Sequence, residues 1–203
     1  MEKSRAEAFT DAIIAIIMTI LVLDLRQPVR FTWAGVWAMR RDLLAYTLSF
    51  FWLGTMWVGL HNEWARVKKI TSGTLWRILF LLFWASLFPY TTKLVASHYN
   101  NSVMQICYGI VVIMTTLANM MLSQQLASLP ANKAIEKSSR FRRHWLCFDL
   151  AIKGLGLVIA AVAYPPAVIW AVLISAFMVA VPAHVIEAHR SFMLALFPHD
   201  KKE

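Results

Sequence analysis

The chain has 203 residues and is 59% hydrophobic but only 15% charged, with a mean hydropathy of +0.58. These values exclude an ordinary soluble domain and indicate an integral membrane protein. The formal net charge of +9 comes from basic residues that cluster between apolar stretches. This distribution is typical of loops that face anionic lipid head groups, and it argues against DNA or RNA as a partner.

Six apolar stretches are long enough to cross the hydrocarbon layer of a membrane, which takes about 20 helical residues. The first has a short apolar core, but Ser4 and Glu7 have the spacing of a capping box, so its helix is expected to begin near Arg5. No cleavable signal sequence is expected, because charged residues interrupt the required order. We predict a single all-α domain over residues 1–203, with spans at about residues 5–24, 43–60, 75–96, 103–122, 145–164 and 167–186.

The basic residues are unevenly divided between the two sides of a membrane crossed six times. The loops on the side opposite to the termini carry only Arg26, Arg30, Arg40 and Arg41. By the positive-inside rule, both termini are therefore expected in the cytoplasm, with the chain in the cell membrane. The larger basic group, on the side of the termini, is made of Lys3, Arg5, Arg66, Lys68, Lys69, Arg77, Lys133, Lys137, Arg140, Arg142, Arg143, Arg190, Lys201 and Lys202.

Two pairs of residues give further signals between and within the spans. Trp33 and Trp37 stand four residues apart before the second span, which predicts a short helix that anchors the chain at the outer membrane interface. Pro89 and Pro182 each remove a backbone hydrogen bond, so we expect kinks in the third and sixth helices.

Ionisable residues inside predicted spans are costly and are therefore candidates for function. Asp149 and Lys153 are four residues apart, so they are expected on one helical face as a structural ion pair, with ion or proton transfer as the alternative. His61 ends the second span at the depth of Arg5 and Asp11. Because an Arg and an Asp near a membrane boundary need partners, we predict a polar network of Arg5, Asp11 and His61.

No motif of a known catalytic class is present, such as HExxH, GxSxG, a Walker loop or GxGxxG, and the histidines are scattered. Cys107 and Cys147 lack the spacing of a metal site. We therefore expect the protein not to be an enzyme and to need neither a cofactor nor a resident metal. The potassium-filter signature TVGYG is also missing, so a channel built from this sequence would select ions in another way.

One helical stripe of the first span holds the only polar side chain between Ala12 and Leu23. That residue is Thr19, whose hydroxyl could also bond back to the carbonyl of Ala15, as threonines often do in membrane helices. The other two stripes are purely aliphatic and suit contact with lipid or neighbouring helices. Steps of three and four residues place the distinct stripe on Phe9, Ala12, Ile16, Thr19 and Leu23.

The run RAEAFTD, from Arg5 to Asp11, resembles the R-x-x-x-F-S-D signature that opens the first transmembrane helix of one channel family. This family comprises the lysosomal and prokaryotic potassium channels that lack the usual selectivity filter. Arg5, Phe9 and Asp11 match the signature, and Thr10 replaces the usual serine while keeping the hydroxyl. Six spans, cytoplasmic termini and a leucine-phenylalanine-proline stretch in the third span extend the resemblance over essentially the whole chain.

The resemblance implies a potassium-selective cation channel that conducts K⁺ passively through a central pore lined by the first helices. Prokaryotic family members with one six-helix unit assemble as tetramers, so the resemblance implies a homotetramer. Carried over by position, Ile16, Thr19 and Leu23 would form the pore constriction. The arginine and aspartate of the signature would support the helix ends, with His61 as a partner.

Two other functions stay open on the sequence. A proton-conducting channel or proton-coupled transporter would need Asp11, His61 or the pair of Asp149 and Lys153 to titrate during turnover. A membrane enzyme or an assembly protein would show no ion conduction at all.

Overall fold

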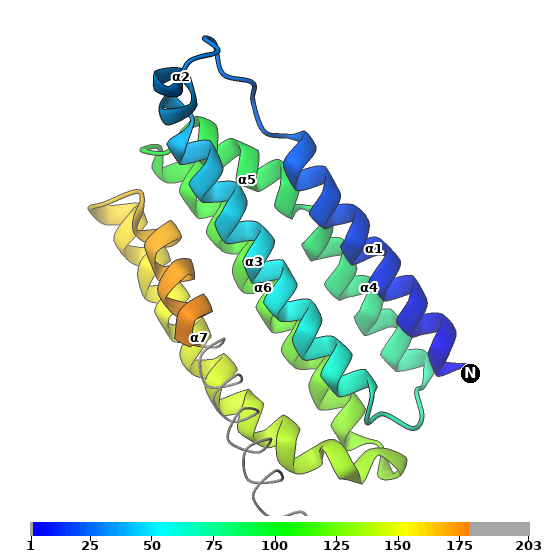
Figure 1. Cartoon of the computed structure of the whole chain (residues 1–203). Coiled ribbons are helices and arrows are strands. Elements are labelled where there is room, and N and C mark those ends of the chain that lie inside the picture. The colour runs from blue at the N-terminus through cyan, green and yellow to red at the C-terminus, as the bar shows by residue number, and fades with distance from the viewer. Residues whose placement is uncertain (1, 179–203) are drawn as a thin grey trace, which may run out of the picture.

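The computed structural model describes residues 2–178, with the backbone alone at residues 134, 136–143 and 145. It is a bundle of helices that run side by side, with α1 at one edge and α7 at the opposite edge (Figure 1). The elements are α1 (Lys3–Leu23), α2 (Trp33–Ala38), α3 (Arg40–Trp64), α4 (Ser72–Ser86), α5 (Phe88–Ser97), α6 (Ser102–Ser128), the 3-10 helix η1 (Pro130–Ile135), α7 (Glu136–Val162) and a further helix over Ala167–Met178.

Four helical segments are long and apolar enough to cross a membrane, namely α1, α3, α4 together with α5, and α6. They coincide with the first four predicted spans, and the all-helical fold class is confirmed. α7 and the helix Ala167–Met178 lie where the fifth and sixth spans were predicted. The predicted sixth span continues past residue 178 and so, with Pro182, extends outside the described residues. The number of six spans therefore stays a prediction.

The third span is broken in the middle, as its proline predicts. Leu87 ends α4 and precedes α5, and Pro89 occupies the first turn of α5, where its missing N–H removes no helical hydrogen bond. The break is held by aromatic packing. The ring of Phe88 stacks on Trp52 of α3, with centroids 4.9 Å apart, and meets Tyr108 of α6 edge-on at 6.2 Å.

The sequence prediction is wrong about how α1 begins and right about the short helix α2. α1 begins at Lys3 after Glu2, without a side-chain cap, so the predicted capping box of Ser4 and Glu7 is wrong because Ser4 already lies inside the helix. The short helix α2 is confirmed over Trp33–Ala38. The hydroxyl of Thr32 caps it by accepting a 3.2 Å hydrogen bond from the N–H of Gly35.

α6 packs against α4, α5 and α7. Hydroxyl groups as well as apolar contacts join the helices around it. The hydroxyl of Ser49 in α3 lies 2.8 Å from that of Thr92 in α5 and 3.1 Å from that of Tyr108 in α6. All three side chains are buried, so these contacts satisfy groups that water cannot reach. α1 lies outside this arrangement and packs against α3, α4 and α5 (Figure 1).

Candidate functional site

One face of α1 holds the helix in the subunit. Its buried residues follow steps of four, four, three and four, the spacing of a single helical face. Because α1 packs against α3, α4 and α5, this face is the one turned toward the bundle. The residues are Ala6, Thr10, Ile14, Ile17 and Leu21.

The opposite face of α1 is the stripe that the sequence singled out, and we call it the α1 stripe: Phe9, Ala12, Ile16, Thr19 and Leu23. All five side chains are exposed, with exposed fractions of 49% for Phe9, 56% for Ile16 and 80% for Leu23. The structure thus brings the three predicted constriction residues onto one face. No described part of the subunit buries that face.

Thr19 directs its hydroxyl proton into its own helix. The hydroxyl donates a 2.7 Å hydrogen bond to the carbonyl of Ile16, and not to that of Ala15, the acceptor in the alternative interpretation of this residue. Since a hydroxyl has one proton and two lone pairs, the oxygen of Thr19 keeps acceptor capacity after this bond. An exposed oxygen with free lone pairs is a group that can contact a cation.

The aspartate of the signature is held by a residue that the sequence analysis missed. The indole N–H of Trp57 in α3 donates a 2.9 Å hydrogen bond to Asp11 Oδ1. His61 stacks on Trp57, with ring centroids 5.5 Å apart, and so reaches Asp11 only through the indole. Arg5 is exposed, and no described residue accepts a hydrogen bond from its guanidinium. Within the subunit, the contact is therefore Asp11 with Trp57, not a direct network of Arg5, Asp11 and His61.

Replacing Trp57 with Phe removes this hydrogen bond while keeping an aromatic ring on α3. Because the bond is partly open to solvent, we expect a loss of about 1–2 kcal/mol of folding stability. The measurement is thermal unfolding in detergent, with Trp76→Phe, a change at an exposed tryptophan of α4, as the control. His61→Ala should cost less than Trp57→Phe. An equal or larger cost would mean that His61 itself supports this end of α1.

The α1 stripe and Asp11 lie in the part of the chain that matches a known family. Residues 5–89 match the family model of the endosomal/lysosomal potassium channel TMEM175. The predicted resemblance to lysosomal and prokaryotic potassium channels is confirmed. The match runs from the start of α1 to Pro89 in the first turn of α5.

Two curated relatives of the chain are potassium channels of bacteria. One from Chryseobacterium is 40% identical over 119 residues, which is 58% of this chain and 62% of that protein. One from Streptomyces collinus is 31% identical over 101 residues, which is 48% of this chain and 49% of that protein. The matched part thus spans less than two thirds of either relative.

A solved structure shares the fold. The crystal structure of a lysosomal potassium-selective channel TMEM175 homolog from Chamaesiphon minutus superposes with a TM-score of 0.67. The superposition covers 88% of this chain and 98% of that chain, at 20% sequence identity. The likeness extends well beyond the TMEM175-matching segment and includes most of the described helices.

Thr10 is the position at which the run from Arg5 to Asp11 departs from the R-x-x-x-F-S-D pattern. Its side chain is buried, and its hydroxyl donates a 2.7 Å hydrogen bond to the carbonyl of Ala6 one turn earlier. The hydroxyl is thereby satisfied inside α1, and the additional methyl group packs in the subunit. Thr10 lies on the buried face of α1 and is not part of the α1 stripe.

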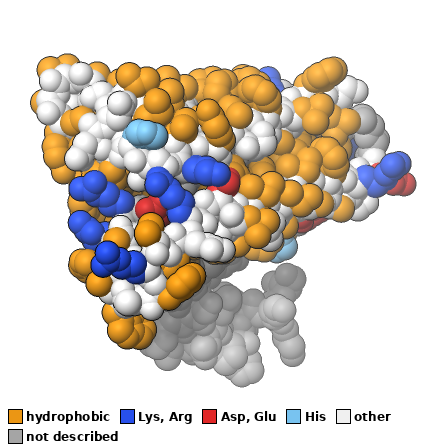
Figure 2. Space-filling model, turned by 90° about the horizontal axis from the view of Figure 1, so that it is seen from above, with side chains coloured by type: hydrophobic (Ala, Val, Ile, Leu, Met, Phe, Trp, Pro, Cys, Tyr) orange, Lys and Arg blue, Asp and Glu red, His pale blue; other side chains and the backbone are white. Residues whose placement is uncertain are grey.

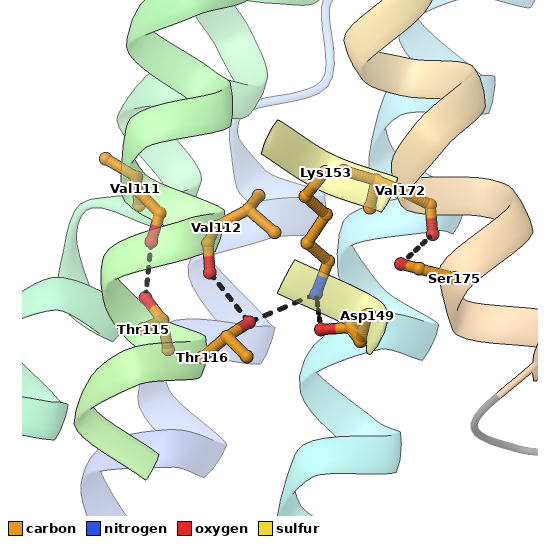
Figure 3. A network of polar contacts seen from close by, with 8 residues as sticks. All are labelled: Val111, Val112, Thr115, Thr116, Asp149, Lys153, Val172 and Ser175. Atoms are coloured by element: carbon orange, nitrogen blue, oxygen red, sulfur yellow. Dashed lines mark hydrogen bonds and ion pairs between the residues drawn. The ribbon is translucent and has the colours of Figure 1, made fainter. Parts of the chain in front are cut away.

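The second polar centre is an ion pair in the interior of the bundle (Figure 3). The Nζ of Lys153 lies 2.5 Å from Asp149 Oδ2 and donates to the hydroxyl of Thr116 in α6 at 3.0 Å. It also lies 4.9 Å from the centroid of the Trp52 ring in α3. Both charged side chains are almost fully buried. The predicted pairing of Asp149 and Lys153 is confirmed.

This centre and the α1 stripe are separate sites. The ion pair is on α7, at the edge of the bundle opposite to α1 (Figure 1). Its ammonium has a carboxylate, a hydroxyl and an aromatic face as partners, so its charge is compensated within the subunit. The geometry therefore favours a structural role for the pair.

Proposed function

We propose that this protein is a potassium-selective cation channel of the cell membrane that conducts K⁺ passively and catalyses no reaction. The observation that carries the proposal is the α1 stripe, an exposed apolar face with one hydroxyl group. It lies in the segment that matches the TMEM175 family, and both curated relatives are named potassium channels.

The assembly that fits this face is a homotetramer with α1 next to the central axis. An exposed apolar stripe on a membrane helix can face lipid, another subunit or a pore. The resemblance to TMEM175-like channels favours the pore, because it implies a central pore lined by the first helices. Four subunits would then place the stripe around the axis and leave Asp11 and Trp57 behind it, where they support the helix.

Selection in such a pore comes from the cost of partial dehydration. Rings of Ile16 and Leu23 side chains would form narrow apolar constrictions that can close by dewetting. Potassium holds its water less strongly than sodium, so K⁺ should cross more easily. The ring of Thr19 oxygens between them would replace part of the lost water contacts. The expected selectivity is modest, because no ring of backbone carbonyls takes part.

The proposed orientation has six spans and both termini in the cytoplasm. The loop from α3 to α4, at the end of the bundle where α1 begins, carries Arg66, Lys68 and Lys69. At the other end, two cations pair with carboxylates: Arg26 with Asp42 at 3.4 Å and Lys93 with Asp24 at 2.9 Å. The excess of basic residues on the side of the termini supports placing that side in the cytoplasm.

The test is ion flux in vesicles that contain the purified protein alone. We expect K⁺ to flow down its gradient, and Na⁺ to flow more slowly under the same conditions. Vesicles without protein and vesicles with heat-denatured protein serve as controls, and light scattering in detergent should give four subunits. Flux that follows the proton gradient, and is lost on neutralising Asp11 or His61, would favour a proton-coupled transporter. No flux from folded, inserted protein would overturn the proposal.

A further inference from the structure

An acidic residue stands where the α1 stripe ends. Asp24 follows Leu23 directly and is the residue at which α1 finishes. Its side chain is partly exposed, at 29%. Lys93 of α5 reaches across to it, and its Nζ donates a 2.9 Å hydrogen bond to Asp24 Oδ1. Lys93 itself is 52% exposed, so both members of the pair can act on ions in the water at this end.

The placement of Asp24 does not serve the stability of α1. The carboxyl end of a helix carries the negative end of its dipole, so a carboxylate is disfavoured there and a cation is favoured. Lys93 supplies the missing positive charge from another helix. Asp24, Asp42 and Lys93 also line one small cavity, in which Lys93 pairs with Asp24 while Asp42 pairs with Arg26. Figure 2 shows basic and acidic side chains side by side at this end of the molecule.

We propose that the pair of Asp24 and Lys93 sets the electrostatic potential at the outer mouth of the pore, and that Lys93 lowers the rate at which cations enter. This inference rests on the proposed function, because it needs α1 to line a pore. Four unpaired Asp24 carboxylates would attract K⁺ into the mouth. With Lys93 beside each of them, the negative charge of the four carboxylates is offset.

The pair differs from the other cations at the same end of the molecule. Arg41 lies over the ring of Tyr99, with its guanidinium carbon 4.9 Å from the centroid, and is not joined to α1. Arg26 pairs with Asp42 of α3. Among the described residues, Lys93 is thus the cation that is bonded to the residue next to Leu23. Arg41 is therefore a matched control, a cation at this end whose removal should leave the pore mouth unchanged.

The test compares K⁺ flux of Lys93→Met, Asp24→Asn, the double variant and Arg41→Met in vesicles. Since charges within about 10 Å interact through water, Lys93→Met should raise flux roughly two- to threefold at low ionic strength, and Asp24→Asn should lower it by a similar factor. The double variant and Lys93→Arg should conduct like the wild type. At about 1 M salt, where screening acts over roughly 3 Å, the differences should disappear.

The salt dependence separates an electrostatic role from a structural one. A change in flux that persists at high salt, or a double variant that conducts no better than Asp24→Asn, would overturn the inference. Equal K⁺ flux through the wild type, Lys93→Met and Arg41→Met would also overturn the inference. Because the wild type would still conduct K⁺, this result would leave the proposed function intact. No flux through the wild type would overturn the proposed function and the inference together.

Discussion

Replacing Asp149 with Asn should destabilise the folded subunit by about 3–5 kcal/mol, because it leaves the ammonium of Lys153 buried without its counter-charge. Thr116 and the ring of Trp52 would remain as partners, but neither carries a negative charge. For a chain of this length, the loss corresponds to a fall of roughly 6–20 °C in the Tm measured in detergent.

A double variant makes this prediction specific. Asp149→Asn combined with Lys153→Met removes both charges, so much of the stability should return, since two neutral side chains need no compensation. Asp42→Asn, which breaks the more exposed contact with Arg26, is the control and should cost at most about 1 kcal/mol. A double variant as unstable as the single one would contradict the account. Potassium flux through a folded double variant would show that the pair is not required for transport.

Replacing Ile16 with Asn should raise K⁺ flux strongly, because an amide in an apolar constriction holds water and lowers the cost of ion passage. A barrier lower by about 1.4 kcal/mol gives about tenfold more flux, which is the size of effect we expect. Selectivity for K⁺ over Na⁺ should fall at the same time, since the ions lose less of their water. The measurement is flux of both ions in vesicles with equal amounts of inserted protein.

The matched control for Ile16 is Val158 of α7. It is also aliphatic and has nearly the same exposed fraction, 58% against 56%, but it lies at the opposite edge of the bundle. Val158→Asn places the same amide on a surface that faces lipid in the proposed assembly, so it should reduce stability without raising flux. Equal K⁺ flux through the two variants would show that the α1 stripe does not line the proposed pore.

The sequence predicted local features of the site better than long-range ones. Asp149 and Lys153 are one helical turn apart, so their pairing follows from the helix alone. Their contacts with Thr116 and Trp52 join separate helices, and no spacing in the sequence reports how those helices pack.

The α1 stripe was predicted because of one polar side chain. Three stripes of the first span are almost equally apolar, and Thr19 was the sole residue to distinguish one of them. The structure buries Ile14, Ile17 and Leu21 and leaves the Thr19 side exposed. Which aliphatic residues would face the bundle was beyond prediction, because that depends on the shapes of α3, α4 and α5.

The partner of Asp11 was missed although the sequence contains a signal for it. Trp57 precedes His61 by one helical turn, so any face of α3 that brings His61 near α1 also brings Trp57. An indole N–H needs an acceptor when it lies between helices, and a carboxylate is a strong one.

Among the described residues, two polar contacts that join α1 to other helices limit how this helix can move. Asp11, in the first half of α1, bonds to Trp57 of α3, and Asp24, which follows the last residue of α1, bonds to Lys93 of α5. Between them, the buried face is almost entirely aliphatic and would permit sliding. Rotation of α1 about its own axis would break both ties at once, so it costs more than a tilt that carries α3 and α5 along. In the proposed tetramer, these contacts favour a tilt of whole subunits relative to one another over a rotation of α1 alone.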